Sequence, residues 1–102
     1  MKTFKDLEFK PHKLSVGAEN LPETIQESYL NAKQAVMEFE NGYGVSVLLG
    51  SCFYSNGIDT YEVGILHNGS LCYSTPITND VIGRISEEEV SEIMIEVQKL
   101  EK

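Results

Sequence analysis

The sequence predicts a single α+β domain, a four-stranded antiparallel β-meander covered by a C-terminal α-helix in two layers. Three observations support this fold class. The triplet X-Asn-Gly, a strong hairpin signal, occurs at residues 40–42, 55–57 and 67–69. Alternating apolar residues flank each triplet, and the C-terminal segment carries an apolar stripe at helical spacing. A length of 102 residues with 41% hydrophobic content fits one globular domain, which we assign to residues 1–102.

Two less regular elements are expected before the meander. Phe4, Leu7 and Phe9 predict a short N-terminal edge strand that ends at Pro11. A cap-like Asn20 and the apolar residues that follow it predict a short helix over about 21–32.

The meander itself is predicted from the three Asn-Gly turns. A three-residue turn places its glycine in the left-handed conformation, which has no steric cost for glycine. Turns of this length predict strands over about 33–39, 43–54, 58–66 and 70–75.

The predicted register gathers the apolar side chains of all four strands, with Leu71 and Tyr73 among them, on one face. One apolar pair across each turn illustrates it, namely Met37–Val45, Leu49–Val63 and Ile65–Leu71.

The clearest single element is the C-terminal helix. Ser86 and Glu89 have the spacing of a capping box, and Ile85 and Val90 form a hydrophobic staple around it. The helix is expected to lay its apolar stripe on the sheet, and this stripe comprises Val90, Ile93, Met94, Val97 and Leu100. Residues 75–84 are expected to be a loop that leads from the sheet to the helix.

Charge and cysteine usage limit the partners. Sixteen Asp and Glu against eight Lys and Arg give a net charge of -8, which disfavours direct binding to nucleic acid. No apolar run is long enough for a membrane span, and we expect no signal peptide. Cys52 and Cys72 lack CxxC spacing, so two reduced thiols in a cytoplasmic protein are expected.

The sequence contains no pattern that indicates enzyme chemistry. The two histidines and two cysteines lack zinc-site spacing, so we expect no metal and no cofactor. Cys72 and His67 are the only pair that suggests thiol catalysis, but the register directs Cys72 to the outer face of the sheet. We therefore assign no catalytic residue and expect a protein that is not an enzyme.

Two surfaces are candidates for binding a partner. Glu88, Glu92 and Glu96 recur every fourth residue opposite the apolar stripe of the helix, and Ile95 lies on the same face. The outer face of the sheet is flat and partly apolar, and Leu48 and Leu66 lie on it. We expect residues 1–33 to cover this second face, with a homodimer or partner interface as the alternative.

Several strings carry a resemblance to a known group of proteins. They read FKDLEFKPH at 4–12, QAVM at 34–37, NGYGVSV at 41–47 and LCYSTPITNDVIG at 71–83. With the acidic C-terminal helix, they resemble a family of small phage- and prophage-encoded hypothetical proteins over about 4–12 and 33–100.

This resemblance implies a phage accessory role in the bacterial cytoplasm and supplies no catalytic residue. Residues 14–32 look like an insertion relative to the family pattern, and Ser74 stands where an Asp is expected. The second departure weakens any acid role for the segment around it.

The functional expectation is a non-enzymatic phage-type protein that binds and modulates a host protein. Its concrete form is an inhibitor of a nucleic-acid-handling or defence enzyme, whose basic groove would receive the acidic surface. The alternatives are a small-ligand binder, such as a nucleotide-sequestering oligomer, and a structural or assembly factor of the phage particle.

Overall fold

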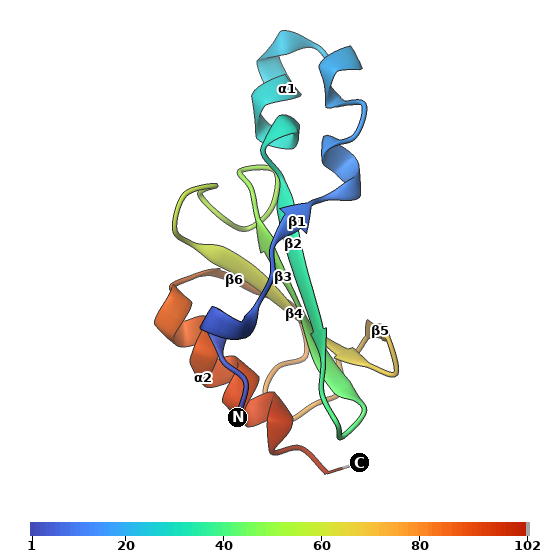
Figure 1. Cartoon of the computed structure of the whole chain (residues 1–102), viewed down its shortest axis with the longest axis vertical. Coiled ribbons are helices and arrows are strands. Elements are labelled where there is room, and N and C mark those ends of the chain that lie inside the picture. The colour runs from blue at the N-terminus through green and yellow to red at the C-terminus, as the bar shows by residue number, and fades with distance from the viewer. Residues whose placement is uncertain (102) are drawn as a thin grey trace.

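A six-stranded antiparallel sheet forms the centre of the computed structural model, which describes residues 1–101 (Figure 1). The predicted α+β architecture, with a C-terminal helix packed on an antiparallel sheet, is confirmed. Four strands follow the order β1-β2-β3-β4, and two short strands both pair with β4. The strand bounds are β1 Lys10–Pro11, β2 Lys33–Glu38, β3 Tyr43–Leu49, β4 Tyr61–His67, β5 Ser70–Leu71 and β6 Ile82–Ile85.

The core lies between the sheet and helix α2 (Glu87–Gln98). On the helix, Val90, Met94 and Val97 are fully buried, as the apolar stripe predicts. Burial of one such side chain stabilises the fold by about 1.5–3 kcal/mol. The facing positions on the strands are equally buried, and they are Val45, Val47, Val63 and Ile65.

Both ends of α2 have side-chain caps. At its start the predicted capping box is confirmed, because Ser86 Oγ accepts from the Glu89 amide and Glu89 Oε1 accepts from the Ser86 amide. At its end, the Asn41 side chain from the β2–β3 turn donates to the carbonyls of Val97 and Leu100, at 2.9 Å each. The second cap joins the turn to the end of the helix by adding a side-chain donor to carbonyls there, and the Val97 carbonyl also accepts from the Leu100 amide at 3.2 Å.

The first nine residues lie on the same face as α2, not along the edge of the sheet (Figure 1). Phe4 lies in the 3₁₀ turn η1 (Phe4–Asp6), and its ring packs edge-on against Tyr61 at 5.0 Å. The predicted N-terminal edge strand ending at Pro11 is present as β1, but it contains only Lys10 and Pro11, and the placement of Phe4, Leu7 and Phe9 on it is wrong. The physical reason is that this segment bonds to α2 instead, as when the Phe4 amide donates to Ser91 Oγ.

Residues 12–32 project beyond the sheet at the top of Figure 1 and give the molecule its length of 45 Å. This extension contains η2 (Lys13–Ser15), η3 (Ala18–Asn20) and α1 (Glu23–Leu30). The helix predicted over 21–32 is present but shorter. Its N-cap is Pro22, whereas the predicted cap residue Asn20 belongs to the preceding 3₁₀ turn.

The first Asn-Gly turn has the predicted register. Met37 lies opposite Val45 and Ala35 lies opposite Val47. Gly42 has a φ of +86°, a left-handed conformation that a side chain would strain.

The second turn is longer than predicted. The strands stop at Leu49 and resume at Tyr61, so Val47 rather than Leu49 lies opposite Val63. The cause is the side chain of Asn56, whose Oδ1 accepts from the amides of Ile58, Asp59 and Thr60. These local bonds give the backbone of residues 50–60 an alternative to strand pairing. Cys52 consequently lies in this loop and not on a strand.

The third turn has two residues, not three. Asn68 and Gly69 both have positive φ, +52° and +85°, as a type I′ hairpin turn requires. The register therefore shifts by one residue, and Leu71 pairs with Leu66 instead of Ile65. As a result Leu71 and Tyr73 leave the apolar face and are half exposed, at 52% and 49%.

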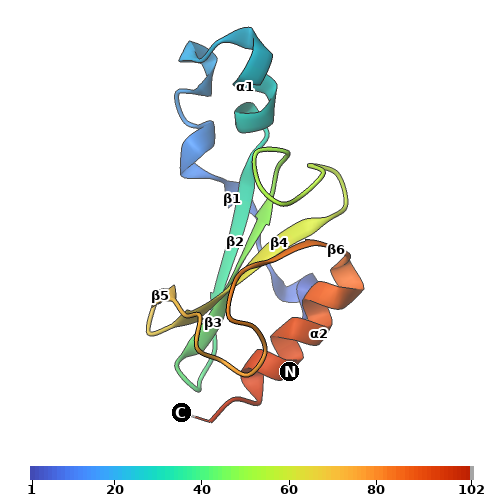
Figure 2. The ribbon, with the colours of Figure 1, turned by 180° about the vertical axis from the view of Figure 1, so that it is seen from behind.

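The segment predicted as a loop over 75–84 contains strand β6, which pairs with β4 beyond the end of β5. Between the two strands the chain folds over the outer face of the sheet (Figure 2). A Cβ placed on Gly64 would lie 2.8 Å from Leu71 Cδ2 and 3.7 Å from Val81 Cγ1. The expectation that residues 1–33 cover this face is wrong, because residues 1–9 lie on the face of α2 and residues 12–32 project beyond the sheet. Leu71 and Val81 cover the outer face at Gly64 instead.

We expect Gly69→Ala to destabilise the fold by about 1 kcal/mol or more, because a Cβ is strained at positive φ. Chemical denaturation monitored by circular dichroism measures this change. Ser70→Ala is the matched control, since Ser70 is exposed beside the same turn. Equal stability of the Gly69 variant and its parent would contradict the type I′ assignment.

Replacing Asn41 by Ala should also destabilise the fold, by about 1–2 kcal/mol, because the carbonyls of Val97 and Leu100 lose a side-chain donor. Asn20→Ala serves as the control, because Asn20 is exposed and lies in the extension that projects beyond the sheet. Amide exchange should report faster opening of the last turn of α2 in the Asn41 variant alone. Unchanged exchange there would show that the cap does not stabilise the helix.

Candidate protein-interaction surfaces

The acidic face of α2, which we define as Glu88, Glu92 and Glu96, is open to solvent along the whole helix. The only ion pair in residues 1–101 joins Glu96 to Lys99 at 3.6 Å, and both of these side chains are more than half exposed. Such a pair contributes little to stability. Ile95, expected among the acids, is half-buried and borders this face.

The residues predicted on the outer face of the sheet are less accessible than expected. Leu48 is half-buried, and Leu66 is buried with 8% of its surface exposed. Leu66 is therefore not part of an exposed partner surface, which corrects the prediction. The structure does not bring these leucines together with the acidic face, since Val47 and Ile65, their chain neighbours, are the residues buried toward α2.

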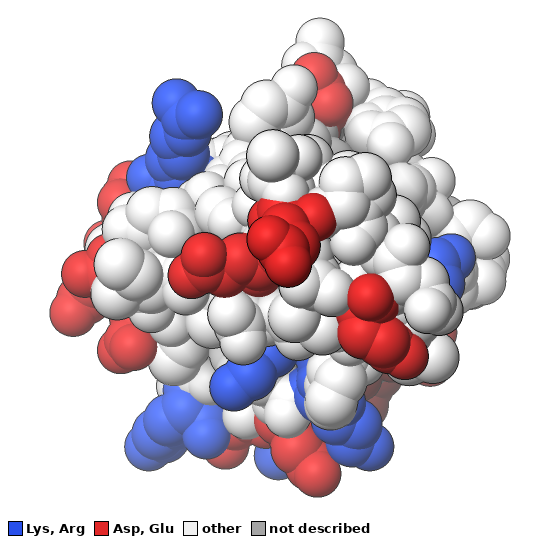
Figure 3. Space-filling model, turned by 90° about the horizontal axis from the view of Figure 1, so that it is seen from above, with Lys and Arg blue, Asp and Glu red and all other residues white. Residues whose placement is uncertain are grey.

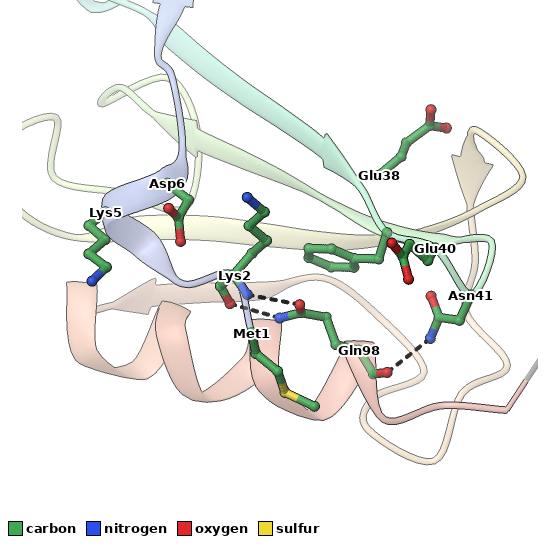
Figure 4. Close-up of a pocket in the computed structure, with 9 residues that line it drawn as sticks. Met1, Lys2, Lys5, Asp6, Glu38, Glu40, Asn41 and Gln98 are labelled. Carbon is green, nitrogen blue, oxygen red and sulfur yellow. Dashed lines mark hydrogen bonds between the residues drawn. The ribbon is translucent and has the colours of Figure 1, made fainter.

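A feature that the sequence did not indicate is a pair of hollows along the edge of β2. The larger, of about 760 Å³, is lined by residues 1–6, the β2–β3 turn and Gln98 (Figure 4). The smaller, of about 350 Å³, is lined by Glu8, Lys10, Pro11, Gln34 and Val36. Both lie where the N-terminal segment leaves β2.

The larger hollow has a mixed lining. On one side of the hollow, Gln98 fixes the N-terminal segment by exchanging two hydrogen bonds with the backbone of Lys2, at 2.9 and 2.7 Å (Figure 4). Two lysines and three acids surround the hollow, with Phe39 as its aromatic member. Because opposite charges are interspersed, the hollow does not have the positive lining that a nucleotide phosphate would favour.

The extension presents exposed apolar side chains. Val16 is 79% exposed, and three further apolar residues, Leu14, Ile25 and Leu30, are each more than 40% exposed. The surface at this end of the molecule is mostly uncharged, with separate acidic groups (Figure 3).

His12 joins the extension to the sheet. It is buried, with 7% of its surface exposed, and its ring lies edge-on to Phe53 at 5.0 Å. Nδ1 accepts from the Leu14 amide and so caps η2. Burial, followed by the charge of Lys13, lowers the pKa of His12 below its ordinary value of 6.5. The neutral ring is therefore the form that the fold uses.

The described residues do not group into a metal site, since residues 1–101 contain no cluster of three His, Cys, Asp or Glu side chains. Cys72 and Cys52 are free thiols. Hydrogen bonding to Ser74 lowers the pKa of the Cys72 thiol, whose sulfur lies 3.5 Å from the Ser74 hydroxyl. Within residues 1–101, none of the helices is long and apolar enough to cross a membrane.

Comparison of the chain with protein-family models, with curated proteins and with solved structures gives no match. The class that the fold and its surfaces define is a small α+β domain with a helix-covered antiparallel sheet, an acidic helix face and an uncovered sheet edge.

The free energy of unfolding should fall as the pH drops below about 6.5. The lowered pKa of His12 means that the unfolded chain binds a proton there at a pH where the folded chain does not. The loss begins near the unfolded pKa and is complete at the lower folded pKa. In His12→Asn, which keeps a capping acceptor without titrating, the urea midpoint should change less between about pH 7.5 and 5.5. An equal change in both proteins would assign the effect to another group.

Proposed function

We propose that this protein is a non-enzymatic, phage-type accessory protein that binds a host protein through the acidic face of α2. The observation that carries the proposal is the row of exposed carboxylates at Glu88, Glu92 and Glu96, set on a helix that is rigidly capped at both ends. The phage-type context and the host partner come from the resemblance of residues 4–12 and 33–100.

The physical basis of binding is electrostatic complementarity. A helix advances 1.5 Å per residue, so carboxylates four residues apart are spaced by about 6 Å along its axis. The helix therefore presents a regular row of negative charges, as a nucleic-acid strand does, and a groove that binds phosphates is lined with Lys and Arg. The net charge of -8 adds long-range attraction and speeds encounter with a basic partner.

The charge distribution favours this proposal over a nucleotide-binding oligomer. The larger hollow carries three acids beside two lysines, which is not the positive lining that a polyphosphate favours. Arg84 is the single arginine of the chain, and it lies on β6 rather than at the hollow. A role in assembly of the phage particle also involves protein binding, and the identity of the captured partner would distinguish it.

The test neutralises the acidic face without changing its shape. A Glu88→Gln, Glu92→Gln, Glu96→Gln variant should retain its melting temperature, because like charges four residues apart are slightly destabilising. Its capture of partners from a bacterial lysate should fall at least about tenfold, and capture by the parent should weaken with added salt.

The matched control is Glu19→Gln, Glu23→Gln, Glu27→Gln, which removes the same charge from the extension. These three residues are exposed and lie far along the chain from α2. The control should capture the partner as the parent does, apart from a small general effect of net charge. Equal capture by both folded variants at low and high salt would reject a role for the acidic face.

A further inference from the structure

The edge of β2 is only partly paired in residues 1–101. β1 covers Lys33 and Gln34, and no backbone hydrogen bond joins the remaining edge at Val36 and Glu38 to another segment. Open edges with free backbone donors and acceptors readily pair with an added strand.

The direction of the free backbone groups of β2 follows from the hydrogen bonds that β2 makes with its neighbouring strands. Phe39 donates to the Tyr43 carbonyl in β3, and the Ala32 carbonyl accepts from His12 on the β1 side. Because backbone groups alternate sides along a strand, the amides and carbonyls of Val36 and Glu38 point toward the β1 side, away from β3. Two donors and two acceptors are therefore available in the spacing that an antiparallel strand requires.

The side chains around the edge specify which strand would fit. Val36 is 56% exposed and lies on the outer face, where the smaller hollow separates it from Glu8. Neither Glu8 nor Glu38 has an ion-pair partner in the described residues. A basic side chain opposite Val36 would lie between these two carboxylates.

Residues of an added strand that point to the other face would meet a different surface. There the larger hollow is lined by the aromatic ring of Phe39, and the Glu38 side chain points away from it (Figure 4). An apolar side chain would be removed from water against this ring.

We propose that the open edge of β2 binds an extended segment of a partner protein in which basic and apolar residues alternate. Backbone hydrogen bonds to Val36 and Glu38 supply the affinity, and the alternating side chains supply the specificity. A second copy of the chain is the less suitable occupant, because each copy carries a charge of -8 and two-fold pairing of Val36 with Glu38 would make the two Glu38 side chains diagonal neighbours.

This inference goes beyond the proposed function, because the edge and the acidic face of α2 have no residue in common. The triple Gln variant of α2 should therefore bind an edge ligand as the parent does. Failure of one proposal leaves the other intact.

The probe is an acetylated and amidated hexapeptide of alternating lysine and valine. With the intact, isotope-labelled protein, amide spectra should show shifts centred on Val36 and Glu38. Their hydrogen exchange should slow about tenfold once about nine-tenths of the protein is bound. The Met37 amide, which already points toward β3, should change little.

Two isomeric peptides control for charge. A lysine opposite Val36 has its backbone groups directed at β2, so N-methylation of the lysines should weaken binding about tenfold or more. N-methylation of the valines, whose amides point away, should leave binding nearly unchanged. The protein variant Glu38→Gln should bind the unmodified peptide more weakly, by about twofold to fivefold.

The proposal is overturned if both methylated peptides bind equally, because attraction would then be electrostatic without strand addition. It is also overturned if the peptide changes no amide signal of β2. The charged residues beside the edge would then serve only to prevent pairing with another strand. Protection of Val36 and Glu38 that rises with protein concentration alone would assign the edge to a second copy instead.

Discussion

The packing of α2 against β3 and β4 is the interaction on which the remaining structure depends. Val90, Met94 and Val97 meet the buried positions of the two central strands, and this contact removes most of the core from water. The helix orientation is fixed in addition by polar bonds at both ends, the capping box at Ser86 and the Asn41 side chain. Because the apolar stripe faces the sheet, the acidic residues are left on the opposite, solvated side of the helix.

The same helix determines the path of the N-terminal segment. Ser91 accepts from the Phe4 amide, and Gln98 exchanges two hydrogen bonds with Lys2. A segment held at these points lies against the core and joins β2 only at Lys10 and Pro11. The open edge of β2 is therefore a consequence of where the core helix holds the N-terminus, and the two hollows mark the space between the diverging segments.

Local signals predicted those parts of the fold that local interactions decide. The capping box and the apolar stripe gave α2, and the first Asn-Gly turn gave its register, because neighbouring residues determine both. The other two turns show the limit of this reasoning. Gly57 and Gly69 have the predicted positive φ, yet the loop around Asn56 is lengthened by side-chain bonds and the Asn68–Gly69 turn is one residue shorter. A single Asn-Gly signal fits several loop lengths, so tertiary packing selects among them.

The candidate surfaces likewise differ in whether local sequence or tertiary packing determines them. Periodicity alone placed Glu88, Glu92 and Glu96 on one exposed face, since helical spacing is a local property. The burial of Leu66 required knowledge of the strand that pairs Leu71 with it, and the exposure of Val36 required knowledge of residues 1–9. The bond between Phe4 and Ser91 spans 87 positions of the chain, so no pattern around Val36 reveals that its edge stays open. A sheet edge becomes a binding surface through the absence of a neighbour, and this absence is decided by interactions elsewhere in the fold.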